Sequence, residues 1–186
     1  PRWMVGFGEG EVRAEKVAAG DAISLILDVE GRVWACGDNT LGQCCLSSTI
    51  MHTDRPVLVP VEEVTSVSAS DNHIAAVTRD GALFVWGCGD QDRLGLSLTA
   101  TSSLPTSNGC VFAPTPTRVD VPCEVSDVAC GVPFTLVLSP QGQVMAAGRI
   151  AGVSDRVGFC ALPLPSTGDE TCVARCIAAG GERWMA

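Results

Sequence analysis

Residues 70–96, which read SDNHIAAVTRDGALFVWGCGDQDRLGL, decide the fold. Two apolar, β-favouring runs, His73–Thr78 and Ala82–Trp86, flank the turn sequence Arg79–Gly81. Short apolar runs around an Asp-Gly pair are typical of a β-hairpin, and we expect a two-residue turn whose central residues both take positive φ. Gly87 ends the second strand, and a loop rich in Gly, Asp and Gln follows.

The same pattern occurs three times at fixed spacing. An anchor residue is followed 11 positions later by a turn glycine, and 6 positions after that by a strand-end glycine. The three sets are Gly20, Gly31 and Gly37; Ser70, Gly81 and Gly87; and Gly131, Gly142 and Gly148. A fourth copy opens at Gly180, so the period is 50, then 61, then 49 residues. Internal repeats of this length indicate units that bury their apolar faces against their neighbours.

Further short strands accompany each hairpin. Strand-like runs precede the hairpins at Lys16–Ala19, Ser66–Ala69, Asp127–Cys130 and Arg175–Ala179, and follow two of them at Pro56–Pro60 and Thr117–Val121. Three or four short strands per period of about 50 residues are typical of a β-propeller blade. The additional length of the second repeat falls in Thr99–Pro116, which is rich in Ser, Thr and Pro. We expect a long, mobile surface loop there.

The sequence therefore predicts one all-β domain over residues 1–186, a partial β-propeller of about three full blades and two terminal half-blades. The repeats cover approximately residues 17–60, 66–121 and 127–171, with partial repeats at 1–16 and 172–186. Trp3–Gly6 matches the end of a second hairpin strand, so the chain begins inside one blade. Because a stable propeller needs at least about four blades, we expect the remaining blades on sequence outside these residues.

Charge and hydropathy exclude some function classes. Twelve Lys and Arg residues against twenty-one Asp and Glu residues give a net charge of −9. An acidic surface repels phosphate, so we expect no direct nucleic-acid binding and a basic protein as partner; acidic residues that only maintain solubility are the alternative. No apolar run reaches the roughly 18 residues of a membrane span, and no signal peptide is recognisable. We expect an intracellular protein, cytoplasmic or nuclear, that binds no membrane.

Ten cysteines are many for an intracellular chain. They form no CxxC pair, and the two histidines are not spaced as zinc ligands. Cys36, Cys130 and Cys176 fall in apolar strand-like runs, where a thiol behaves as a small hydrophobe. Reduced structural cysteines are the favoured interpretation. The alternatives are a disulfide, or a metal or redox site at Cys172 and Cys176.

These motifs resemble the regulator-of-chromosome-condensation repeat of the RCC1-like propellers, which is similar to AGxxHxxALTxxGxVYxWGxNxxGQLG. Residues 70–87 match it almost position by position, residues 31–43 supply the Asn and Gly-Gln of the closing motif, and residues 87–95 supply its Leu-Gly. The resemblance covers nearly the whole chain. It implies a propeller that closes with seven blades, of which about half are present.

The copies have drifted from the repeat pattern at several positions, and in the third copy the closing motif, residues 155–158, follows a two-residue insertion. Cys36 and Ala147 stand where the second copy has Trp86, and Ile23 and Phe134 stand where it has His73. The repeated residues are expected to serve the fold, with His73 a core or blade-linking histidine rather than a catalytic base. The residues given structural roles are Gly20, Gly31, Trp34, Gly37, His73, Gly81, Trp86, Gly87, Gly131, Gly142 and Gly148. Glycine permits the turn backbone, and Trp34, Phe84, Trp86 and Phe134 are expected to pack between blades.

The sequence contains no nucleophile elbow, no phosphate-cradling loop and no metal-ligand spacing. We therefore expect no enzyme, no cofactor and no metal. The loops after the strand-end glycines hold the candidate partner-binding residues Asp38, Asn39, Asp90, Gln91 and Asp92. Their aspartates would line one face, with Asp90 and Asp92 facing outward. Solvated carboxylates are the alternative, and for Asn39 and Gln43 the favoured role is hydrogen bonding to loop backbone.

A non-enzymatic protein-interaction scaffold is the favoured function. The resemblance implies an alternative, guanine-nucleotide exchange on a Ran-type small GTPase, which needs loops that open a nucleotide site and no covalent chemistry. Chromatin association through histones is a third hypothesis, compatible with the negative charge. One fold hosts many functions, so the choice depends on the site.

Overall fold

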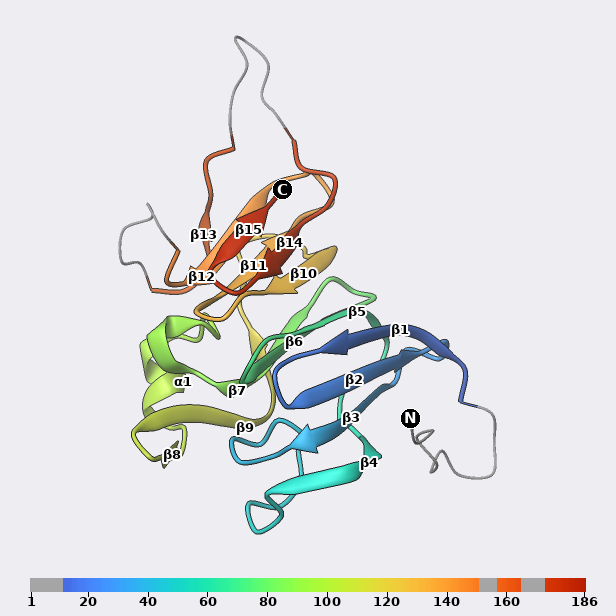
Figure 1. Ribbon diagram of the computed structural model, residues 1–186. Coiled ribbons are helices and arrows are strands. Elements are labelled where there is room, and N and C mark those ends of the chain that lie inside the picture. The colour runs from blue at the N-terminus through green and yellow to red at the C-terminus, as the bar shows by residue number, and fades with distance from the viewer. Residues whose placement is uncertain (1–11, 151–156, 165–172) are drawn as a thin grey trace.

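The computed structural model describes residues 12–150, 157–164 and 173–186, and four antiparallel sheets follow one another through it (Figure 1). The first sheet has the order β1 (Ala14–Ala19), β2 (Ile23–Asp28), β3 (Val33–Asp38) and β4 (His52–Leu58). The all-β prediction is confirmed. Trp3–Gly6 lies outside the described residues. Within them, none of the helices has the length and apolar character that crossing a bilayer requires.

The other three sheets also begin with consecutive antiparallel strands, but they differ in the number of strands. The second contains β5 (Val64–Ala69), β6 (His73–Thr78), β7 (Leu83–Cys88), β9 (Cys110–Val119) and β8 (Thr106–Ser107), in that order. The third contains β10 (Asp127–Cys130), β11 (Phe134–Leu138), β12 (Val144–Gly148) and β13 (Cys160–Ala161), and the last is the pair β14 (Ala178–Gly180) and β15 (Arg183–Met185). The first strands of consecutive sheets pack against one another: β1 on β5, β5 on β10, and β10 on β14.

The predicted hairpin of the second repeat is present, but its turn is different. The N–H of Gly81 donates to the carbonyl of Thr78, the N–H of Thr78 donates to the carbonyl of Ala82, and only Gly81 takes positive φ. This is a three-residue turn with a glycine bulge, in place of the predicted two-residue turn. The other two hairpins form the same bonds around Gly31 and Gly142, so one turn type serves all three sheets.

The prediction of a loop at Thr99–Pro116 is wrong. That segment begins with helix α1 (Leu98–Ser102), where the hydroxyl of Ser97 accepts the N–H of Ala100 as an N-cap, and it continues into the hairpin of β8 and β9. The segment lacks periodicity because it is half exposed and because Pro114 and Pro116 lie within β9. We call residues 97–119 the insertion, since they lengthen the connection after β7.

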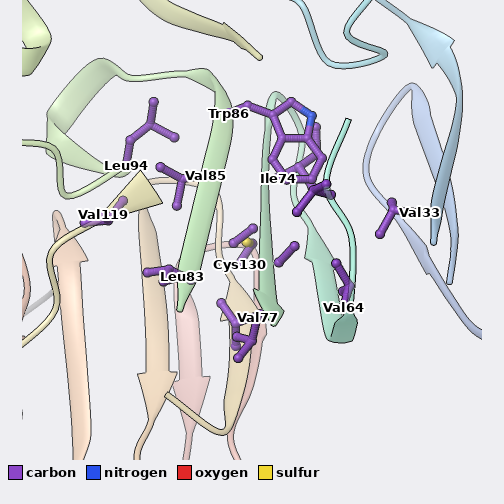
Figure 2. Packing of buried hydrophobic residues seen from close by; sticks show 14 of the residues in the cluster. Val33, Val64, Ile74, Val77, Leu83, Val85, Trp86, Leu94, Val119 and Cys130 are labelled. Atoms are coloured by element: carbon purple, nitrogen blue, oxygen red, sulfur yellow. The ribbon is translucent and has the colours of Figure 1, made fainter. Parts of the chain in front are cut away.

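The apolar core lies between the sheets. β6 is buried along its whole length because neighbouring sheets cover both of its faces, which explains its continuous apolar sequence. Ile74, Val85 and Trp86 are fully buried at the centre of this core (Figure 2). A second cluster, built around Phe134 and Leu136, fills the space between the third sheet and the terminal pair.

Each hairpin turn is also tied to the start of the next sheet. The carbonyls of Gly31, Gly81 and Gly142 accept the N–H groups of Val64, Val125 and Ala174, at 2.9, 3.1 and 2.9 Å. At Gly81 a side chain would collide with Glu124, whose Cγ would lie 2.3 Å from an added Cβ. Glycine therefore permits both the positive φ of the turn and the close approach of the next connection.

Candidate protein-binding site

The loop after β3 is held together by its own polar side chains. Asn39 is 2% exposed; its Oδ1 accepts the N–H groups of Cys44 and Leu46, and its Nδ2 donates to the carbonyl of Ile50. A carboxylate oxygen of Asp38 accepts the side-chain amide of Gln43 at 2.8 Å. Asn39 is thus engaged with loop backbone, and both candidate residues of this loop have partners inside the loop.

The loop after β7 differs from the predicted outward arrangement. Oδ1 of Asp90 accepts the N–H of Val111 in the insertion, and Oδ2 of Asp92 accepts the N–H of Gly158 at 2.7 Å. Burial raises the pKa of Asp92. Both carboxylates therefore point into neighbouring backbone, because their loop is covered by the insertion and by the third sheet. Gln91 is the exposed candidate, and its φ is +60°.

Trp86 and His73, two residues of the matched repeat motif, each form a hydrogen bond to a neighbouring sheet. The indole N–H of the fully buried Trp86 donates to the carbonyl of Gln43, at 2.9 Å, in the loop of the first sheet. Nε2 of His73 lies 2.9 Å from the hydroxyl of Thr135, which donates to the carbonyl of Arg93. Because that hydroxyl gives its proton to Arg93, Nε2 of His73 is the donor. Burial and the charge of Arg93 lower the pKa of His73 to about 3, so it stays neutral at physiological pH.

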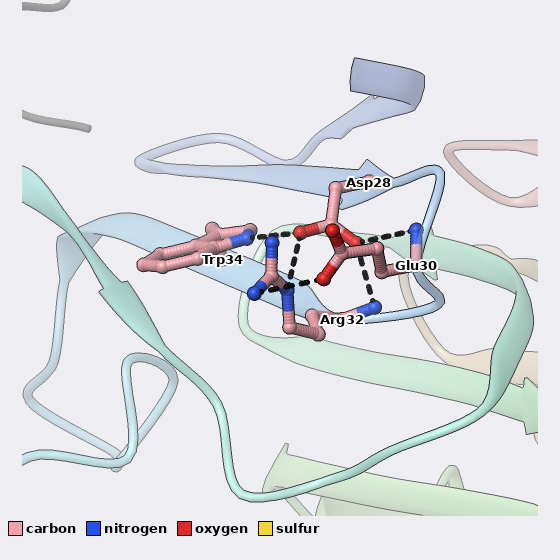
Figure 3. Close-up of polar contacts among 4 residues, drawn as sticks. All are labelled: Asp28, Glu30, Arg32 and Trp34. Atoms are coloured by element: carbon pink, nitrogen blue, oxygen red, sulfur yellow. Dashed lines mark hydrogen bonds and ion pairs between the residues drawn. The ribbon is translucent and has the colours of Figure 1, made fainter. Parts of the chain in front are cut away.

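A compact ionic network caps the hairpin turn of the first sheet (Figure 3). The carboxylate of Asp28, fully buried, accepts the N–H groups of Glu30 and Arg32, the Nε of Arg32 and the indole of Trp34. Burial disfavours the charged form, but these hydrogen bonds outweigh it and lower the pKa of Asp28. Trp34 is therefore half-buried under Arg32, rather than enclosed between sheets as Trp86 is.

Exposed carboxylates gather instead at the hairpin-turn edge of the second sheet. Two adjoining hollows of about 530 and 320 Å³ share Asp80, Ala82 and Arg118. The connection before β5 lines one hollow and the connection before β10 lines the other. We call this surface the acidic groove; its exposed charged side chains are Glu62, Glu63, Asp80, Arg118, Asp120 and Glu124.

The charged and apolar residues of the acidic groove can together bind a side chain with a cationic end and an aliphatic chain, such as Lys or Arg. The hydroxyl of Thr78, the N–H of Ala82 and, more weakly, the charge of Arg118 lower the pKa of Asp80. Five carboxylates face a single arginine among the lining residues, so the groove attracts positive charge. The partly exposed Phe84 adds apolar surface beside these charges, where the methylenes of Lys or Arg can pack.

Sequence reasoning missed the acidic groove, because its residues come from three connections that meet only when the sheets pack. The repeat spacing does contain a pattern that could have indicated the groove. Glu63 and Glu124 are 61 positions apart, which is the second period, and each immediately precedes the residue that bonds to a turn glycine. A carboxylate therefore occupies this position in two successive copies, whereas the next copy has Val173 there.

Comparisons with known proteins identify the family. A model described as the regulator of chromosome condensation (RCC1) repeat matches residues 30–77 and 80–138, and a second model of that description matches residues 14–43 and 64–92. The chain belongs to the RCC1 repeat family, as its motifs predicted.

Curated relatives share the repeat region. Serine/threonine-protein kinase Nek8 of Danio rerio is 29% identical over 177 residues, which cover 86% of this chain and 24% of the relative. Serine/threonine-protein kinase Nek9 of Mus musculus is 32% identical over 142 residues, covering 72% and 13%. The chain thus spans a quarter or less of the length of these kinases, and the match lies over their RCC1-like region.

Solved structures show the same fold. Prp20p from Saccharomyces cerevisiae has a TM-score of 0.75 at 17% identity, covering 91% of this chain and 42% of that structure. Human WBSCR16 has a TM-score of 0.73 at 23% identity, covering 91% and 44%. Since the chain spans less than half of each propeller, the fold is a partial RCC1-like β-propeller. We refer to the first three sheets as the first, second and third blades.

Proposed function

We propose that this chain is a non-enzymatic protein-binding part of an RCC1 propeller, and that its acidic groove takes a Lys- or Arg-rich segment of the partner. The observation that carries the proposal is the meeting of five exposed carboxylates around two hollows, drawn from consecutive connections. The two hollows adjoin, and each has room for more than one long side chain, so an extended basic segment that places successive residues in them suits the groove.

Histones are the class of basic partner with the best support. The structure of Prp20p is described with its binding to Gsp1p and to histones, and histone tails are rich in Lys and Arg. The net charge of −9 would steer such a tail toward this chain. A nuclear or cytoplasmic location is part of this proposal.

The test uses a fluorescent peptide with alternating Lys and Gly, whose anisotropy is measured with the 186-residue chain. A triple variant, Glu62→Gln, Glu63→Gln and Glu124→Gln, removes three charges from the groove. The matched control, Glu15→Gln, Asp21→Asn and Asp54→Asn, removes three exposed charges elsewhere. Because each exposed charge pair contributes up to about 1 kcal/mol, we expect Kd to rise about tenfold in the groove variant and less than about twofold in the control.

If peptide binding were weakened equally in both variants, the effect would come from the net charge of the chain, and the groove would not be the binding site. A third variant, Asp38→Asn, Asp90→Asn and Asp92→Asn, tests the strand-end loops. The peptide affinity of this variant should match that of the control. Circular dichroism checks its fold, because Asp38, Asp90 and Asp92 accept hydrogen bonds from the N–H groups of Thr40, Val111 and Gly158. A larger loss than in the groove variant would move the site to those loops.

Nucleotide exchange on a Ran-type GTPase is the second candidate function, supported by the naming of Gsp1p alongside Prp20p. It requires only that a loop open the nucleotide site of the GTPase, so the RCC1 fold is compatible with it. A Ran-type GTPase loaded with fluorescent nucleotide should then release it faster when micromolar chain is added. An unchanged release rate would leave peptide binding as the sole proposed function.

A further inference from the structure

Two cysteine sulfurs meet where the insertion joins the end of β7. Cys88 is the last residue of β7 and Cys110 is the first of β9, and these strands are paired, with Cys88 opposite Phe112. The two Sγ atoms are 2.8 Å apart. Non-bonded heavy atoms rest about 3.5–4.0 Å apart, and a disulfide needs about 2.05 Å. No disulfide joins the cysteines of the described residues, and these two sulfurs lie closer than non-bonded packing favours.

We propose that Cys88 and Cys110 form a reversible disulfide, which fastens the insertion to the end of β7. Cys110 lies two residues before Phe112, the pairing partner of Cys88, and the two side chains reach toward each other until their sulfurs lie 2.8 Å apart. This pair differs from Cys172 and Cys176, which spacing singled out: Cys176 is exposed, and Cys172 lies outside the described residues.

The bond can form by exchange with a small-molecule disulfide such as oxidised glutathione. Cys110 is partly exposed, whereas Cys88 is 4% exposed, so Cys110 meets the oxidant first. The thiolate of Cys110 attacks one glutathione sulfur, and one glutathione leaves as a thiolate that takes up a proton. The thiolate of Cys88 then attacks Sγ of Cys110 and displaces the second glutathione. In total two protein thiols are oxidised to one disulfide, and one glutathione disulfide is reduced to two thiols.

The neighbourhood makes this exchange slow at neutral pH. Burial, the contact with Cys88 and the nearby carboxylate of Asp90 raise the pKa of Cys110 to about 12. Only thiolate attacks a disulfide, so the rate of cross-linking rises about tenfold per pH unit between pH 7 and 9. Once Cys110 has reacted, the adjacent Cys88 closes the bond intramolecularly, and a second glutathione competes poorly.

A metal site fits the same residues less well. Cys88, Asp90 and Cys110 offer three donor atoms within 4.8 Å of one another. Two thiolates on tetrahedral zinc, at Zn–S of about 2.3 Å, lie about 3.7 Å apart, so the sulfurs would have to separate. Oδ1 of Asp90 also already accepts the N–H of Val111. The observed approach of the sulfurs favours direct bonding between them.

The test incubates the chain with oxidised glutathione at pH 8, blocks remaining thiols with iodoacetamide, and maps disulfides by peptide mass spectrometry. We expect the Cys88–Cys110 peptide to be at least about tenfold more abundant than either cysteine carrying glutathione. Exposed Cys176 should carry glutathione and so report that the oxidant acted. Modified Cys176 without the cross-linked peptide would overturn the proposal, and this readout needs no variant.

Limited proteolysis supplies the second readout. Oxidation should slow cleavage within the insertion in the wild type and in Cys123→Ser, a control that removes another partly buried thiol. It should have no effect on cleavage in Cys110→Ser. Equal protection in Cys110→Ser would contradict the proposal. A one-to-one zinc complex that shields both cysteines from iodoacetamide and persists in oxidised glutathione would also overturn it, in favour of a metal site.

Discussion

Two junctions between blades can be compared, the first between blades one and two and the second between blades two and three. At each junction a backbone carbonyl at the same repeat position accepts a hydrogen bond, but the donor differs. Gln43 and Arg93 each lie six residues after a strand-end glycine. The carbonyl of Gln43 accepts the indole of Trp86, and the carbonyl of Arg93 accepts the hydroxyl of Thr135. The third blade has Ala147 at the position of Trp86 and so lacks the indole donor. The loop carbonyl is therefore the fixed element of the junction, and its donor is interchangeable.

The buried residues beside each donor also differ between the two junctions. Ile23 and Ile74 occupy the positions that His73 and Thr135 take one blade later, and all four are buried. At these positions the first junction is apolar apart from one indole, whereas the second contains a chain of hydrogen bonds. A buried polar chain is stabilising only while every member has its partner. The two junctions should consequently respond differently to substitution and to acid.

The largest effect is expected at the first junction. Trp86→Ala removes a fully buried indole and leaves the carbonyl of Gln43 without its donor, so the free energy of unfolding should fall by about 4 kcal/mol. Trp86→Phe keeps most of the apolar surface and should cost about 2 kcal/mol. Urea denaturation measures both, with the partly exposed Trp184→Ala as control. A loss in Trp86→Ala no greater than in the control would show that this junction does not depend on the indole.

A smaller effect is expected at the second junction, with an asymmetry between its members. Thr135→Val leaves both the carbonyl of Arg93 and Nε2 of His73 without a hydrogen-bond partner. The free energy of unfolding should therefore fall by about 3 kcal/mol. His73→Leu should cost less than about 1 kcal/mol, because Thr135 still reaches Arg93 and the unpartnered Nδ1 of the histidine disappears. Urea denaturation of both variants measures these two losses. A greater loss in His73→Leu than in Thr135→Val would make the histidine the essential member.

An effect smaller than that of Thr135→Val is a pH dependence confined to the second junction. The pKa of His73 is about 3 when folded and about 6.5 when unfolded, so between these values the unfolded chain binds a proton that the folded chain does not. Stability should therefore fall as the pH drops below 6.5, by about 2 kcal/mol at pH 5. Denaturation at pH 7 and pH 5 tests this. His73→Leu should lose that part of the dependence, and the exposed His52→Ala should keep it.

The strands of the propeller could be predicted because spacing and hydrophobicity are local properties. The bounds of β6 and β10 match the predicted His73–Thr78 and Asp127–Cys130. The turn around Gly81 was assigned the wrong type, because an Asp-Gly pair is compatible with more than one turn and the contact with Glu124 is not visible locally. The insertion was missed because α1 is short and β9 contains two prolines.

The candidate site was much less predictable. Asp90 and Asp92 were expected to face outward, but the backbone that they bind belongs to Val111 and Gly158, which lie far along the chain. The acidic groove depends on the same kind of long-range packing, since Glu62 and Asp120 reach one edge only through the arrangement of blades. Sequence periodicity predicts which residues occupy equivalent positions. It does not predict what lies beside them.

The tie from each turn glycine to the next blade has a consequence for synthesis on the ribosome. The carbonyls of Gly31 and Gly81 are exposed by a hairpin that is translated before the amides of Val64 and Val125 that they bind. Each acceptor is therefore synthesised before its donor. The ties between successive blades thus run in the direction of translation, so each can form as soon as its donor strand has emerged.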